Sequence, residues 1–142
     1  IELSILLNTA KNDSCNLSLY CSAEFLAEQK RFSEAKDLYL QLSQNPQAFV
    51  FFSFAKLRAA EMLIATDAFS AAIADLSLIV EEAEKNIYAD KALYLQGQIY
   101  QYGLKDSAKA VESYESLLAK FPKSLYLDEA RQNIIELKKK LS

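Results

Sequence analysis

Apolar side chains recur along most of the chain at intervals of three and four residues, the spacing of one face of an α-helix. Segments with this pattern predict helices at about 2–11, 14–29, 33–44, 48–65, 69–85, 89–103, 107–120 and 125–140. The sequence holds only two glycines and two prolines, the residues that most often interrupt helices. We therefore expect an all-α fold with short connections.

One segment permits a second interpretation. Residues 48–57 (AFVFFSFAKL) crowd four phenylalanines together, and a short apolar run also fits a buried strand. The run continues without a breaker into LRAAEMLIA, which has helical spacing, so we favour a helix. A helix that is apolar on all sides is expected to be covered by its neighbours. The alternative is an exposed patch used for partner binding or dimerisation.

The chain also resembles itself at a fixed period, which is typical of stacked repeats. Three alanines, Ala35, Ala72 and Ala110, are separated by 72 − 35 = 37 and 110 − 72 = 38 residues. Large side chains follow each of these anchor alanines after four and seven residues: Tyr39, Leu76 and Tyr114, then Leu42, Ile79 and Leu117. Each anchor is therefore expected on the second helix of a helical hairpin.

Small residues precede the anchors on the first helix of each hairpin. Ala23 and Ala60 stand twelve residues before their anchors, whereas Gly97 stands thirteen before Ala110. We attribute the difference to one inserted residue in the turn GLKD, residues 103–106. Small residues on facing helices let the two backbones approach closely.

These features together resemble the tetratricopeptide repeat. Besides the small and anchor residues, the repeats carry a large apolar residue (Leu26, Leu63, Tyr100), an aromatic at the turn (Phe32, Phe69) and, in the third unit, Pro122 at the exit. The resemblance covers about residues 13–142 and is closest in the third unit. The run FPKSLYLDEAR is further similar to bacterial envelope members of the family.

The sequence also departs from the family pattern. Its periods of 37 and 38 residues exceed the usual 34. Ser107 stands where an aromatic is expected, and Glu84 replaces the exit proline of the second unit.

The resemblance implies a right-handed superhelical stack of about seven to eight helices in one domain. Its parts would be residues 1–11 (the end of a preceding repeat or a cap), 13–47, 48–86 and 87–123 (three repeats) and 124–142 (a capping helix). Apolar residues at positions 3, 6, 7 and 10 suggest that the chain is cut from a longer protein. The end exposed by such a cut could form a homodimer.

The resemblance also implies a function, the binding of a protein or peptide segment in a groove lined by the first helix of each hairpin. Carried over, the groove positions are Tyr20, Glu24, Glu28, Phe54, Leu57, Glu61, Tyr94, Gln98, Gln101 and Tyr102, with Leu17, Ala27, Ile64, Ala65 and Lys91 beside them. Aromatic and acidic residues suit a basic or amide-rich ligand, and they argue against the acidic chaperone tails that some family members bind. For each side chain, packing between repeats is the alternative.

Catalysis has little support in the residues. There is no histidine, which is the commonest general base and the usual partner of a nucleophile. No glycine-rich phosphate loop is present, and we expect no cofactor or metal. Glu24, Glu28 and Glu61 are the remaining group of carboxylates, for which a solvated or salt-bridged role is favoured over acid–base chemistry.

The charge distribution narrows the choice of partners. A net charge of −3 argues against nucleic acid, and no apolar stretch reaches the ~18 residues of a membrane span. The basic run 138–140 is expected to cap the last helix by complementing its dipole, with an anionic partner as the alternative. No targeting signal is recognisable, so bacterial periplasm and cytoplasm both remain open.

Two further predictions concern the cysteines and the helix N-caps. Cys15 and Cys21 would lie about 9 Å apart along one helix, too far for a disulfide, and are expected to be buried. The candidate helix N-caps are Asp13, Ser33, Asp106 and Ser124.

Overall fold

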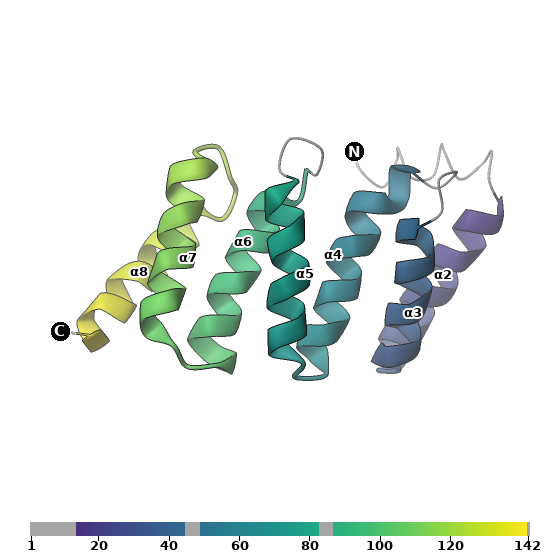
Figure 1. The fold of residues 1–142 in the computed structure, drawn as a ribbon, viewed down its shortest axis with the longest axis horizontal. Coiled ribbons are helices and arrows are strands. Elements are labelled where there is room, and N and C mark those ends of the chain that lie inside the picture. The colour runs from purple at the N-terminus through teal and green to yellow at the C-terminus, as the bar shows by residue number, and fades with distance from the viewer. Residues whose placement is uncertain (1–13, 45–48, 83–86, 142) are drawn as a thin grey trace. The chain divides into compact units, whose positions relative to one another are not determined.

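The computed structural model describes residues 14–44, 49–82 and 87–141, with side chains from 18 to 44, 54 to 82 and 87 to 141. Within these ranges the chain is helical and contains no strand, as the apolar spacing predicts (Figure 1). The predicted helix at 2–11 and the candidate cap Asp13 lie outside the described residues. None of the described helices is long and apolar enough to cross a membrane.

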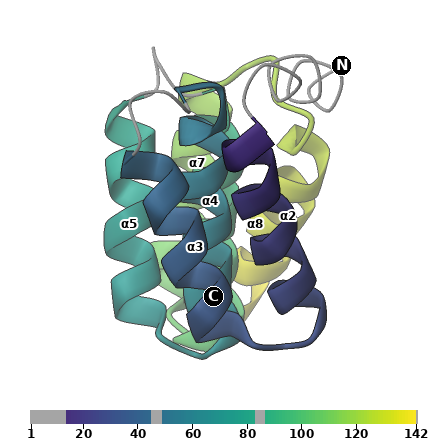
Figure 2. The same ribbon diagram turned by 90° about the vertical axis from the view of Figure 1, so that its right-hand side faces the viewer.

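The helices fall into two compact units, which are described separately. The first unit, Ile1–Ala68, holds α2 (Ser14–Glu28), α3 (Phe32–Gln44) and α4 (Phe49–Ala65), and α3 packs against both of the others (Figure 2). Residues 49–65 are thus helical, as predicted. The side chains of Phe49, Phe51 and Phe52 lie outside the described residues.

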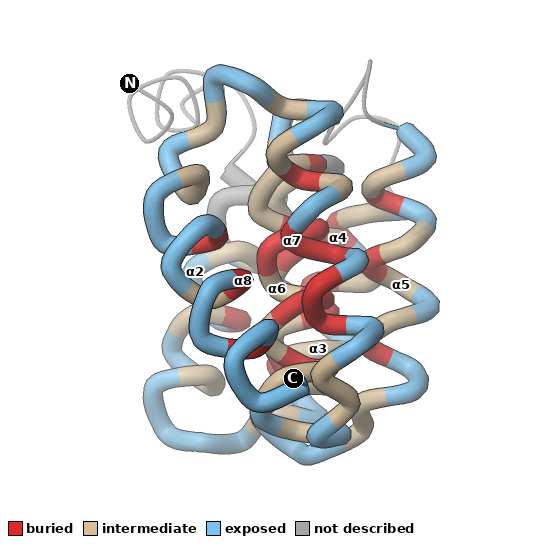
Figure 3. Tube along the Cα trace, turned by 90° about the vertical axis from the view of Figure 1, so that its left-hand side faces the viewer, coloured by how far each residue is buried: buried red, intermediate tan, exposed pale blue. Residues whose placement is uncertain are grey.

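The second unit, Phe69–Ser142, holds the helices α5 (Phe69–Glu81), α6 (Ala89–Gln98), α7 (Ser107–Lys120) and α8 (Leu127–Leu141). A five-residue π-helix, η2 (Ile99–Gly103), extends α6. Consecutive helices pack in pairs, α5 with α6, α6 with α7 and α7 with α8. In Figure 3 the buried positions of α7 and α8 gather on one side of each helix and the exposed positions on the other.

The repeat positions inferred from self-similarity form the core. The three anchor alanines are fully buried, and the large residues four and seven positions later are at most 1% exposed. Ala23, Ala60 and Gly97 are buried as well. A Cβ atom placed on Gly97 would lie 2.5 Å from Cε1 of Tyr114, so the close approach expected at this position is confirmed.

The three turns between first and second helices share one geometry. Each contains a residue in the left-handed region, Lys30 (φ 63°), Asp67 (φ 62°) or Lys105 (φ 55°), five positions before the anchor alanine. Such a residue ends a helix because it turns the backbone away from the helix axis. The turn and the second helix therefore keep a fixed register in all three cases.

The extra residue of the third hairpin lies in the helix and not in the turn, so its predicted place in GLKD is wrong. After the left-handed residue, the N–H of Arg31 donates to the carbonyl of Leu26, five residues back. The equivalent N–H of Asp106 donates to Tyr100, six residues back, and Leu104 N–H donates to Ile99. The wider π turn accommodates one more residue without changing the turn that follows.

The cap and cysteine predictions have mixed outcomes. Asp106 caps α7 by accepting a hydrogen bond from the N–H of Lys109 at 3.1 Å, as predicted. Ser33 lies inside α3 and does not cap it. Ser124 accepts from the N–H of Tyr126, but α8 begins only at Leu127, so this prediction is also wrong. Cys21 is exposed, because it lies on the outer side of α2, and not buried as expected.

The basic run lies in the last turn of α8, where cations complement the negative end of the helix dipole. Its first residue, Lys138, also pairs with Glu115 of α7 at 3.2 Å. This is the location that the capping interpretation requires. The side chain of Cys15 lies outside the described residues.

Candidate functional site

A charged network joins the three helices of the first unit. Arg58 of α4 donates from Nε to Oε1 of Glu24 on α2 at 3.1 Å, and from Nη1 to Oε2 of Glu61 at 2.8 Å. The hydroxyl of Tyr39 on α3 donates to the same oxygen of Glu24. We call Glu24, Tyr39, Arg58 and Glu61 the arginine network.

The arginine network changes the expected electrostatics of this surface. Two carboxylates and one guanidinium leave a net charge of −1, so Arg58 halves the negative charge expected from Glu24 and Glu61. The guanidinium carbon of Arg58 also lies 5.4 Å from the centre of the Tyr39 ring, a cation–π contact. Arg58 was not among the predicted groove residues. Its place three residues before Glu61 on one helix could have indicated the pair.

Tyr39 is held in its neutral form. Burial raises the pKa of Tyr39 well above its ordinary value, and the hydrogen bond to the Glu24 carboxylate raises it further. The hydroxyl therefore stays a donor over the whole physiological range. It fixes one oxygen of Glu24 where Arg58 can reach it.

The other predicted positions of the first unit differ in accessibility. Tyr20 and Phe54 are half-buried, and their rings lie 5.7 Å apart at 53°. Leu57 is 1% exposed and belongs to the core. Glu28 is exposed, and of the three glutamates weighed for catalysis only Glu24 and Glu61 belong to the arginine network.

A second network, made mostly of neutral groups, joins α6 and α8 in the second unit. The hydroxyl of Tyr94 donates to Oε2 of Glu129 at 2.7 Å and accepts from Nε2 of Gln98 at 2.9 Å. The Tyr94 ring stacks on Tyr126, with centres 4.9 Å apart and 16° between the planes. We call Tyr94, Gln98, Tyr126 and Glu129 the tyrosine network.

Tyr114 of α7 adds a parallel contact behind this network. Its hydroxyl donates to Oε1 of Gln101 at 2.7 Å, and its ring lies 5.9 Å from that of Tyr94. Burial raises the pKa of Tyr94, and the bond to Glu129 raises it further. Burial likewise raises the pKa of Tyr114, with Tyr94 as the next cause. Both hydroxyls therefore remain protonated donors at neutral pH.

The structure brings the predicted positions of α6 together with residues that the sequence did not assign. Tyr94 is buried, Gln98 and Gln101 are half-buried, and Tyr102 is 63% exposed. Their neighbours Tyr126, just before α8, and Glu129, on α8, were missed because α8 was expected to act only as a cap.

One feature of the sequence could have assigned α8 to the same face. Ala130 is fully buried and follows Gly97 by 130 − 97 = 33 residues, so it has the place of the small residue on a first helix. This interval is shorter than the earlier period of 37, which hid the relation. Helix α8 therefore ends the second unit and also carries the small buried residue that is typical of the first helix of a hairpin.

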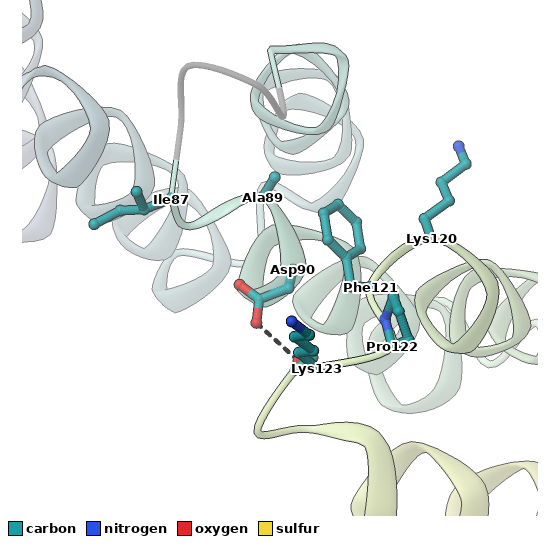
Figure 4. Close-up of a pocket in the computed structure, with 8 residues that line it drawn as sticks. Ile87, Ala89, Asp90, Lys120, Phe121, Pro122 and Lys123 are labelled. Carbon is teal, nitrogen blue, oxygen red and sulfur yellow. Dashed lines mark hydrogen bonds between the residues drawn. The ribbon is translucent and has the colours of Figure 1, made fainter.

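Two surface pockets of the second unit lie apart from the predicted groove residues. One, of about 440 Å³, lies between the start of α6 and the link from α7 to α8 (Figure 4). There Ser124 donates to Asp90 at 2.8 Å, and Lys120 points away from the other lining residues. The other, of about 290 Å³, is lined by Ser77, Leu93, Gln96, Tyr100, Lys109, Glu112, Ser113 and Ser116.

No metal site is evident in the part of the chain that the structure describes. Among its cysteines, aspartates and glutamates, no group of three or more lies close enough to hold an ion.

Comparison with known families identifies one segment of the chain. Residues 91–124 match the tetratricopeptide repeat model. The match covers most of α6, all of η2 and α7, and the turn that follows, which is the unit predicted to be closest to the family. No curated protein matches the chain.

Proposed function

We propose that this chain binds a protein or peptide segment along the first helices of its hairpins, because residues 91–124 match the tetratricopeptide repeat, which generally mediates protein–protein interaction. In the second unit the binding surface is formed by Gln98 at the end of α6, Gln101 and Tyr102 of η2, Tyr126 just before α8, and Glu129 of α8. We call these five residues the α6–α8 face.

The observation that carries the proposal is that the buried Tyr94 of α6 fixes polar side chains, whereas Tyr102 of η2 is left exposed. Tyr94 is buried and holds Gln98 and Glu129 in place by hydrogen bonds. Tyr102 remains 63% exposed, although it is large and apolar over most of its surface. Aromatic side chains supply contact area at little conformational cost, which makes an exposed tyrosine beside fixed polar groups suited to binding.

The first unit offers a second surface of similar character. Tyr20 and Phe54 form a half-buried ring pair beside the arginine network. With its net charge of −1, this surface favours a ligand segment that is basic or rich in amides. Glu129 gives the α6–α8 face the same preference.

A non-catalytic role fits these contacts. The family is typically a non-catalytic interaction module, and the ion pairs of Glu24 and Glu61 with Arg58 occupy carboxylates that acid–base chemistry would need. Self-association or an intramolecular role in a larger protein is the second candidate. It rests on the apolar pattern at the N-terminal end of the sequence and remains a prediction.

Selection of peptides from a displayed random library by the intact chain tests the proposal. We expect selected peptides to be enriched in Lys, Arg, Asn or Gln, and to lose at least tenfold in affinity for Gln98→Ala and for Tyr102→Ala. Two controls, Leu78→Ala on α5 and Glu112→Ala on α7, remove exposed side chains from second helices. Circular dichroism confirms that all four variants fold.

Equal binding to the intact chain, Gln98→Ala and Tyr102→Ala would contradict the proposal. A selective loss with Glu112→Ala would instead assign binding to the 290 Å³ pocket, which that residue lines. Concentration-dependent self-association without any selected peptide would favour the second candidate.

A further inference from the structure

Gln98 at the end of α6 and Gln101 in η2 are each held by a tyrosine hydroxyl, but by opposite ends of the amide. Gln98 uses its Nε2 group toward Tyr94, whereas Gln101 uses its Oε1 atom toward Tyr114. The rings of Tyr94 and Tyr114 lie 5.9 Å apart, so the two amides that their hydroxyls hold lie near each other. The end that each amide leaves over is therefore different: an oxygen that can accept at Gln98, and an NH₂ group that can donate at Gln101.

The orientation of the Gln98 amide follows from the chemistry of Glu129. A charged carboxylate can only accept hydrogen bonds, so Tyr94 must donate its single hydroxyl proton to Glu129. The same hydroxyl can then only accept a bond from residue 98. Of the two ends of a glutamine amide only the NH₂ group donates, so the Oε1 atom of Gln98 faces away from Tyr94.

Gln101 has the reverse orientation. Tyr114 donates its proton to Oε1 of Gln101, which leaves the NH₂ group directed elsewhere. Within the described residues, no hydrogen bond uses Oε1 of Gln98 or Nε2 of Gln101. The end of α6 therefore presents a fixed acceptor at 98, and η2 presents a fixed donor at 101.

This pair of groups matches the main chain of an extended segment. In an extended strand the N–H and C=O of one residue point to the same side, and a neighbouring strand exchanges two hydrogen bonds with them. Gln98 Oε1 can accept from such an N–H while Gln101 Nε2 donates to the C=O. Recognition of this kind does not depend on the ligand's side chains.

We propose that Glu129 is a positioning residue that acts through Tyr94 to fix the Gln98 amide, so that the α6–α8 face recognises the main chain of an extended ligand segment. This inference rests on the proposed function and specifies which part of the ligand is read there. Tyr102 and Tyr126 then contact the ligand's side chains beside that main-chain contact.

The first test needs no ligand. Glu129→Gln keeps the size of an exposed side chain but adds a donor, so Tyr94 can reverse its hydrogen bonds. In nuclear magnetic resonance spectra we expect the side-chain NH₂ signals of Gln98 to shift and to exchange faster with water in this variant, and those of Gln101 to stay. Tyr94→Phe, which removes the hydroxyl itself, gives the same change. Unaltered Gln98 signals in both variants would overturn the proposal.

The second test uses the tightest peptide from the library selection, remade with single main-chain esters. Each ester replaces one N–H by oxygen and leaves the side chains unchanged. We expect one ester position to weaken binding to the intact chain about five- to tenfold, and to have no effect on Gln98→Ala. Glu129→Gln weakens the unmodified peptide about three- to tenfold. The double variant Tyr94→Phe/Glu129→Gln should bind the unmodified peptide no more weakly than Tyr94→Phe alone, because both substitutions act through the same hydrogen bonds.

The outcomes separate this inference from the proposed function. If Gln98→Ala weakens binding while Glu129→Gln and every ester leave it unchanged, the face binds a ligand but the positioning role of Glu129 is wrong. If neither Gln98→Ala nor Tyr102→Ala weakens binding, the proposed function fails as well.

Discussion

The two units place different chemistry at equivalent positions of the repeat. Counted from the small residue of the first helix, Glu24 in the first unit corresponds to Gln98 in the second, each one position later. Glu24 accepts bonds from Tyr39 and Arg58, whereas Gln98 donates to Tyr94. One backbone position therefore serves a network of three charged groups in one unit and a network with a single charged group, Glu129, in the other.

The anchor helices differ in a related way. Tyr39 and Tyr114 both stand four residues after an anchor alanine, and both hydroxyls donate to the first helix of their hairpin. Tyr39 reaches the residue after the small position, whereas Tyr114 reaches Gln101, four residues after it. The first and third hairpins thus share a buried tyrosine ring at this position but differ in its hydrogen-bond partner.

The largest expected effect is a loss of stability at alkaline pH in both units. An unfolded tyrosine loses its proton near pH 10, whereas Tyr39, Tyr94 and Tyr114 have raised pKa values in the folded chain. Above pH 10 the folded state then binds more protons than the unfolded state, so the free energy of unfolding falls as pH rises. Below pH 10 the stabilisation is fully present.

Urea unfolding between pH 7 and pH 12 measures this slope. Replacing Tyr39 and Tyr94 by phenylalanine should flatten it, at the expense of some stability at neutral pH. A slope that is the same with and without the two hydroxyls would show that other groups cause the alkaline loss.

Next in size is the removal of Arg58. Arg58→Met leaves the half-buried Glu24 and Glu61 without their shared guanidinium, and we expect a loss of about 2–3 kcal/mol in the free energy of unfolding. Arg131→Met on α8 is the control, because its pair with Asp128 is exposed and contributes at most about 0.5 kcal/mol. Similar losses in the two variants would contradict a special role for the arginine network.

A smaller loss is expected for Gly97→Ala in the second unit. The added methyl group meets the Tyr114 ring at 2.5 Å, and overpacking of this kind costs about 1–2 kcal/mol. Combining it with Tyr114→Leu removes the ring atoms that collide, so the methyl group should then cost less. If Gly97→Ala is equally destabilising in both backgrounds, the close approach is not its cause.

The smallest effect concerns the turns, where the two units should behave alike. Lys30→Gly and Lys105→Gly each relieve a left-handed backbone conformation and should stabilise the chain by about 0.5 kcal/mol in thermal unfolding. Lys36→Gly within α3 serves as the control and should destabilise by about 1 kcal/mol. A gain at only one of the two turns would indicate that the π-helix alters the turn after all.

The fold could be predicted well from the sequence because the residues that define the repeat are buried. The anchor alanines, the small residues and the large residues four and seven positions later are spaced by helix geometry, and all of them are buried. The π-helix could not be located in this way. A change of spacing from twelve to thirteen residues reveals an insertion but not whether the helix or the turn contains it.

The candidate site was harder to predict because hydrogen-bond partners are chosen in three dimensions. Leu57 and Tyr94 share the spacing of a groove position, yet both are buried. The bonds of Arg58 to Glu24 and of Tyr94 to Glu129 join separate helices, so they depend on how the helices pack and not on spacing within one helix. Helical periodicity shows which side of a helix is polar but not which polar groups meet.

The most direct test of the central claim is a nuclear magnetic resonance titration of the intact chain with its tightest selected peptide, following the side-chain amide signals of glutamine. The account predicts that Gln98 and Gln101 shift on binding, while Gln41, exposed on the second helix α3, does not. Shifts at Gln41 with none at Gln98 and Gln101 would place the ligand elsewhere and contradict the assignment of the binding surface to the first helices.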